Sequence, residues 1–115
     1  MRAVICSRFD GIDALELGEL ADPVPGPGQV LVDVHAAALS FMDTLIVAGR
    51  YQLKPRLPFV PGSDAAGVVL AVGEGVQYVR VGDRVACGHW HGGMAERMVV
   101  PASAVLKLPF STLMP

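Results

Sequence analysis

This 115-residue chain has few charged residues, few aromatic residues, no cysteine pair and no run of basic residues. Charged residues make up 17% of the chain and aromatic residues 6%, and the formal net charge is −2. Nucleic-acid binding relies on clustered lysine and arginine, so this balance argues against DNA or RNA as a partner. No apolar run approaches the roughly 20 residues of a membrane-spanning helix. We therefore expect no membrane segment, no signal peptide and a cytoplasmic location.

Metal-ligand patterns are also scarce. The two cysteines, Cys6 and Cys87, stand far apart without a Cys-x-x-Cys pair, which predicts free thiols in a reducing compartment. Cys87, His89 and His91, with His35 further away, are the remaining metal candidates, but glycines flank them and no carboxylate or second cysteine stands near. We expect no bound metal, and we keep a metal-binding domain as a rival hypothesis.

Glycine and proline, in contrast, are frequent, with 13 and 9 residues, and they separate short apolar segments. This alternation of turn residues and short apolar segments predicts strands over residues 2–7, 14–20, 30–38, 66–71, 76–81, 84–87, 95–100 and 105–108. Val30, Val32 and Val34 would share one face of the third strand. About eight strands with one or two short helices predict a single, mainly β domain built as a small, partly open β-barrel.

Residues 40–67 break this pattern. Ser40 and Asp43 have the spacing of a capping box, which predicts a short helix that ends at Gly49. Phe41 and Leu45, and Met42 and Ile46, form apolar i, i+4 pairs that predict one core-facing side. The prolines of the 57–62 segment keep the chain extended, and Gly62 and Gly67 permit a turn or a close backbone approach.

Nucleotide and acyl-transfer signatures are missing. Gly26-Pro27-Gly28 and Gly73-Glu74-Gly75 lack the third glycine of the dinucleotide fingerprint, and neither opens a predicted helix. Ser63 and Asp64 have no histidine placed near them by a motif, as a serine nucleophile would need. We therefore expect no phosphate-binding loop and no acyl transfer within this chain.

Five motifs in order carry a family resemblance. They are Ser40-Phe41-Met42-Asp43-Thr44, Ala48-Gly49-Arg50-Tyr51, Leu57-Pro58-Phe59-Val60-Pro61-Gly62-Ser63-Asp64, Gly82-Asp83-Arg84-Val85 and Gly92-Gly93-Met94-Ala95-Glu96. Over essentially the whole chain, this series resembles the zinc-independent, quinone oxidoreductase-like branch of the medium-chain dehydrogenase/reductases. The resemblance implies that residues 1–115 form a GroES-like, alcohol dehydrogenase-like N-terminal catalytic domain, with the nucleotide-binding domain absent.

The resemblance also implies a function, namely NADPH-dependent hydride transfer to a quinone or another activated alkene such as an enone. Tyr51, Ser40 and Asp43 would be catalytic, and Ser40 and Ser63 would face the cofactor. Tyr51, Trp90 and His91 would contact the substrate. The zinc enzymes of the superfamily have Cys and His where Ser40 and Ser63 stand, so we expect no zinc.

The resemblance also implies how the chain would behave without a nucleotide-binding domain. NADPH would bind only together with the missing domain, so the chain would be inactive by itself, and the sequence does not separate NADPH from NADH. Apolar surface left uncovered would favour a homo-oligomer. The rival from another class is a non-enzymatic GroES-like module that binds a partner protein.

Overall fold

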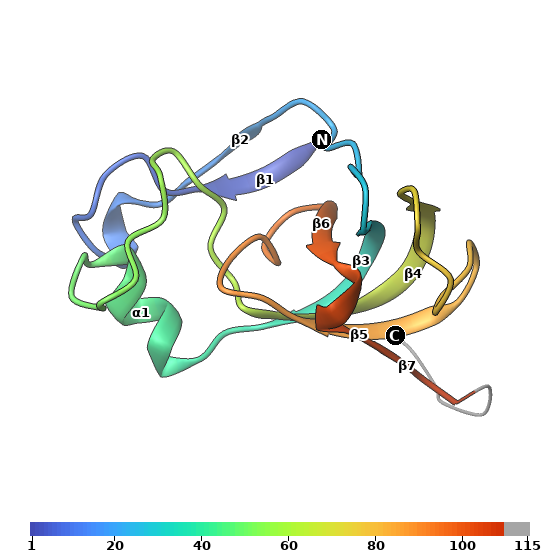
Figure 1. Cartoon of the computed structure of the whole chain (residues 1–115). Helices are drawn as coiled ribbons and strands as arrows, with labels where there is room; N and C mark the ends of the chain where they lie inside the picture. Colours follow the sequence, from blue (N-terminus) through green and yellow to red (C-terminus); the bar gives the residue numbers. More distant parts are fainter. Residues whose placement is uncertain (110–115) are drawn as a thin grey trace.

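The computed structural model describes residues 1–109, which form seven strands and one α-helix. The elements are β1 (Arg2–Ile5), β2 (Glu16–Glu19), β3 (Gln29–Ala38), α1 (Phe41–Val47), β4 (Asp64–Val72), β5 (Arg84–Gly88), β6 (Arg97–Pro101) and β7 (Val105–Lys107), with 3₁₀ turns η1 (Ile12–Ala14) and η2 (Ala102–Ala104). Figure 1 shows a curved sheet at one end, α1 at the other, and β1 and β2 above the space between them. The mainly β fold class with short helices is confirmed.

The strands form two antiparallel sheets that do not close into a barrel. The larger sheet has the order β6-β3-β4-β5-β7, and β1 and β2 form a separate pair. The larger sheet therefore ends at two edge strands, β6 and β7, which agrees with the predicted partly open fold. In residues 1–109, no helix has both the length and the apolar composition needed to cross a membrane.

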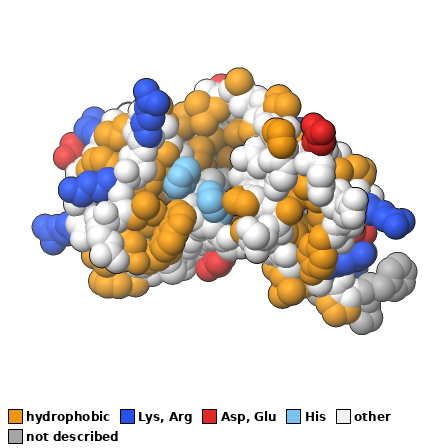
Figure 2. All heavy atoms as spheres, viewed as in Figure 1, with side chains coloured by type: hydrophobic (Ala, Val, Ile, Leu, Met, Phe, Trp, Pro, Cys, Tyr) orange, Lys and Arg blue, Asp and Glu red, His pale blue; other side chains and the backbone are white. Residues whose placement is uncertain are grey.

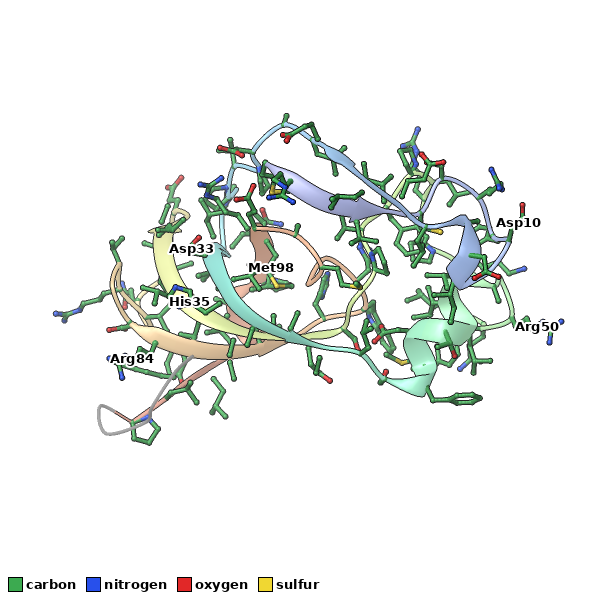
Figure 3. All side chains as sticks on the ribbon, turned by 180° about the vertical axis from the view of Figure 1, so that it is seen from behind. Asp10, Asp33, His35, Arg50, Arg84 and Met98 are labelled. Carbon is green, nitrogen blue, oxygen red and sulfur yellow. The ribbon has the colours of Figure 1, made fainter. Side chains whose placement is uncertain are left out.

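The concave side of the larger sheet holds the main core. Val30 and Val32 are fully buried there, as the alternation of valines predicts, and Val34 packs partly buried against the same cluster. Met98 of β6 is only 3% exposed and lies inside the curve of the sheet (Figure 3). Asp33 and His35, also labelled in Figure 3, belong to the opposite face of β3 and pair with each other at 3.4 Å.

The strand predicted over residues 76–81 does not form, so this prediction is wrong. Val79 is buried in the main core, at 2% exposure, which explains the apolar signal. The backbone N–H of Arg80, however, donates to the Asp83 carboxylate at 2.9 Å. This local side-chain bond replaces a sheet partner, so the segment is a loop that inserts one valine into the core.

The helix begins and ends as predicted. Ser40 and Asp43 form the capping box, and the N–H of Ser40 donates to Asp43 Oδ2 at 2.8 Å. Gly49 has a φ of 70°, its N–H donates to the Ile46 carbonyl at 3.0 Å, and the Arg50 N–H reaches the Leu45 carbonyl at 2.9 Å. These two bonds form a Schellman end, which needs a left-handed residue at the position of Gly49.

The predicted core-facing side of the helix needs one correction. Met42 and Ile46 face a second apolar cluster that contains Cys6, Val47 and Phe59. Phe41, in contrast, is 78% exposed. Successive helix positions are rotated by about 100°, so only one of the two i, i+4 rows can face the interior of such a short helix.

Candidate active site

Two segments that are far apart in the sequence lie side by side and build the site. The N–H of His89 donates to the Ser63 carbonyl at 2.8 Å, and the N–H of Gly92 donates to the Val60 carbonyl at 2.7 Å. Gly62, with a φ of 103°, accepts from the Gly93 N–H at 2.9 Å, and a Cβ there would lie 3.0 Å from the Met94 backbone nitrogen. Of the two predicted roles of this glycine, a turn or a close backbone approach, the structure shows the close approach. These bonds fix the loop that carries Trp90 and His91 against the start of β4.

A groove of about 640 Å³ opens where this loop meets the start of the helix. Ser40, Ser63 and Trp90 line it together, and we call it the serine groove. The other lining residues come from the ends of β4, β5, β6 and α1, from the loop after β5 and from η2: Met42, Asp64, Gly88, His89, Pro101, Ser103 and Ala104. Trp90 is half exposed, so its ring is available to a bound molecule.

Asp43 lies behind the serine groove and holds both serines. It is 4% exposed, and its Oδ2 accepts from the Ser40 hydroxyl at 3.2 Å and from the Ser63 hydroxyl at 3.4 Å. An ionised carboxylate can only accept, so each hydroxyl hydrogen points toward Asp43. In the capping box the Ser40 hydroxyl oxygen also accepts from the Asp43 N–H, so Ser40 keeps one acceptor lone pair, and Ser63 keeps its own, for a molecule in the groove.

The two loop histidines extend the site to a neighbouring cleft. His89 lines both the serine groove and this cleft, whereas His91 lines only the cleft. The His91 ring meets the Phe59 ring edge-on at 5.6 Å and lies 5.7 Å from the His89 ring. Burial, and secondly the proximity of His89, lower the pKa of His91, so its imidazole is neutral at neutral pH.

Tyr51 lies apart from the serines. It packs half-buried against the cluster of Cys6, Ile46, Val47 and Phe59, and it does not line the serine groove. Ser40, Asp43, Ser63 and Trp90 thus come together, His91 lies in the adjoining cleft, and Tyr51 supports the apolar cluster next to them.

The cysteines are free and buried, which confirms the predicted thiols. Cys87 points into the main core, with its Sγ 3.7 Å from Met98 Sδ. Burial, and secondly the charge of Asp64, raise the pKa of Cys87 to about 11, so the thiol stays protonated at neutral pH. Burial likewise raises the pKa of Cys6. In the described part of the chain, no three His, Cys, Asp or Glu side chains form a metal-binding group, so the rival metal hypothesis gains no support.

Sequence reasoning missed part of the groove. Pro101 at the end of β6, and Ser103 and Ala104 of η2, line the groove, but the sequence there predicts only a turn. The resemblance places the loop of His89, Trp90 and His91 at the substrate cleft, but it does not single out His89, which lines both the groove and the neighbouring cleft. No local pattern distinguishes these residues, because the sheet pairings that bring them to the groove are long-range.

The chain resembles known proteins in sequence and structure. Residues 26–110 match the family "Alcohol dehydrogenase GroES-like domain". The quinone oxidoreductase of Lama guanicoe is 43% identical over 111 residues, which cover 95% of this chain and 34% of that protein. A solved structure of a probable oxidoreductase from Mycobacterium abscessus has a TM-score of 0.87 at 41% identity, over 95% of this chain and 34% of that one.

A third likeness concerns a cofactor complex. The Escherichia coli quinone oxidoreductase complexed with NADPH has a TM-score of 0.87 at 27% identity, over 98% of this chain and 35% of that chain. The chain therefore spans about a third of the length of these relatives. The family match covers more than half of the chain, and the observed fold is the one that the match implies. The chain belongs to the family of alcohol dehydrogenase GroES-like domains.

Proposed function

We propose that residues 1–115 form the substrate-side domain of an NADPH-dependent oxidoreductase that reduces quinones or similarly activated alkenes. The observation that supports this most is the serine groove, in which two serines held by a buried carboxylate face a half-exposed tryptophan. The relatives named as quinone oxidoreductases, one of them solved with NADPH, agree with this chemistry. The groove alone would not hold the phosphates of a dinucleotide.

The serines fit a nicotinamide. Its carboxamide carries an NH₂ group, and Ser40 and Ser63 offer acceptor lone pairs because their own hydrogens are directed to Asp43. When bound, the nicotinamide supplies the hydride, and the chain supplies placement and exclusion of water. Two serine hydroxyls do not replace the thiolate and imidazole that hold catalytic zinc, so the proposed reaction uses none.

The quinone, which accepts the hydride, would bind against the loop that carries Trp90 and His91. The exposed face of Trp90 suits stacking of a flat quinone ring. We propose His91 as a substrate contact from the adjoining cleft. Tyr51 stays a proposed substrate-side residue that acts through the Phe59 cluster. Leu39 and Phe41, beside Ser40, are 65% and 78% exposed, and we propose that a second copy or a further domain covers them.

The single tryptophan of the chain gives a direct test. A neutral tricyclic quinone, 2-(hydroxymethyl)anthraquinone, is expected to quench Trp90 fluorescence saturably, because it would stack in the serine groove. Ser103→Phe would fill the groove and abolish saturation, whereas Ser7→Phe, at an exposed position away from the groove, would leave it unchanged. Purely linear, collisional quenching of the unaltered chain would contradict the proposal.

A further inference from the structure

A second pocket, the cleft that His91 lines, lies beside the serine groove. It has a volume of about 400 Å³ and shares His89 with the groove. We call it the arginine cleft, because Arg56 and Arg97 line it together with His91. Its walls are apolar: Ile5, Leu20, Pro23, Pro58, Phe59, Val60, Met98 and Val99. Figure 2 shows histidine side chains in the middle of the hollowed face, with hydrophobic side chains on both sides.

The charged side chains that line the arginine cleft are all positive. No carboxylate side chain is among its described lining residues. Arg97 is neutralised from outside, since its Nη1 lies 3.1 Å from Asp22 Oδ1. The Met1 amine lies 3.1 Å from the same oxygen and 3.7 Å from Glu19 Oε2, so Asp22 and Glu19 together balance Arg97 and this amine. The amine and Arg97 lower the pKa of Asp22. Arg56 is exposed and pairs with no carboxylate in the 1–109 range. One uncompensated positive charge thus remains at the rim.

The interior of the cleft favours an apolar body. Phe59 is 6% exposed and presents its ring to His91 at 5.6 Å. A half-buried, uncharged imidazole between hydrocarbon walls suits an aromatic or aliphatic group better than a strongly hydrated one. Small-molecule sites commonly combine such walls with a few convergent polar groups. The matching ligand therefore has an apolar body and an anionic end.

We propose that the arginine cleft binds the anionic substituent of the electron acceptor, so that the preferred substrates are elongated quinones carrying a carboxylate or sulfonate. The quinone ring would lie on Trp90 in the serine groove, and its substituent would pass His89 into the cleft and meet Arg56. This inference rests on the proposed function, because it extends the same acceptor site.

The test compares two quinones with the same ring system. Anthraquinone-2-sulfonate is expected to quench Trp90 with an affinity about fivefold higher than that of neutral 2-(hydroxymethyl)anthraquinone, as a partly solvated charge contact allows. Arg56→Gln is expected to remove this preference. Lys54→Gln, which removes the same charge from an exposed position two residues away, is expected to keep it. The preference should also weaken as salt concentration rises.

Each outcome separates the two proposals. Equal, saturable affinities for the two quinones would overturn the inference and leave the proposed function intact. Saturation by neither quinone would overturn both. A sulfonate preference that survives Arg56→Gln, or that Lys54→Gln removes equally, would show attraction by overall charge and would overturn the arginine cleft as its source.

Discussion

Gly67→Ala is expected to lower the free energy of unfolding by about 4 kcal/mol, a large part of the stability of a small domain. Gly67 lies in the middle of β4, opposite Val34 of β3. A Cβ built there would lie 1.9 Å from the backbone carbonyl oxygen of Asp33 and 3.0 Å from a Val32 methyl group. The contact is with backbone, so the strands would have to separate or shift.

Gly88→Ala is the matched control. Gly88 is also a sheet glycine, in β5, but its added Cβ would lie 3.5 Å from an Asp64 carboxylate oxygen, which is an ordinary contact. We expect a change below about 1 kcal/mol, as at most surface positions. Urea unfolding followed by circular dichroism measures both variants, and equal midpoints would show that β3 and β4 do not approach as closely as described.

Asp43→Ala is expected to cost about 3 kcal/mol and to disorganise the serine groove. Three donors, the Ser40 N–H, the Ser40 hydroxyl and the Ser63 hydroxyl, share Asp43 Oδ2 as their acceptor, and the variant removes it. A lost helix cap contributes about 1 kcal/mol, and donors left unpaired in a buried site contribute the remainder. The same unfolding measurement gives the stability, and amide NMR shifts of residues 40 and 63 report the local disorder.

Asp43→Asn separates packing from hydrogen bonding at this site. Asparagine has the same shape and keeps one acceptor oxygen, so we expect it to retain most of the stability that alanine loses. Asp13→Ala removes an equal charge from an exposed position and controls for net charge. If Asp43→Asn is as destabilising as Asp43→Ala, the negative charge matters more than the acceptor oxygen, and the proposed orientation of the serine hydroxyls has to be revised.

Local patterns in the sequence were sufficient for the helix and for most strands. The spacing of Ser40, Asp43 and Gly49 identifies the helix because caps act within one turn of the chain. The alternation of Val30 and Val32 identifies the buried face of β3 for a similarly local reason. Val79 shows the limit, since a valine buried from a loop gives the same signal as a strand.

The site was only partly predictable. Ser40, Ser63 and Trp90 line one groove with Asp43 behind it, whereas Tyr51 lies outside the groove. This arrangement depends on the pairing of loop 89–94 with residues 60–63. Such pairing joins residues about 30 positions apart, and no local propensity encodes it. For the same reason the sequence did not show that Arg56 would share a cleft with His91.

A chimaera tests the proposed role of this domain most directly. This chain would replace the matching segment of the human quinone oxidoreductase, to which it is 42% identical over 111 residues. NADPH-dependent reduction of a quinone is expected to persist, lowered by at most about a hundredfold through small misplacements at the new domain boundary. A folded chimaera that binds NADPH but reduces no quinone would contradict the proposal and would favour a partner-binding module.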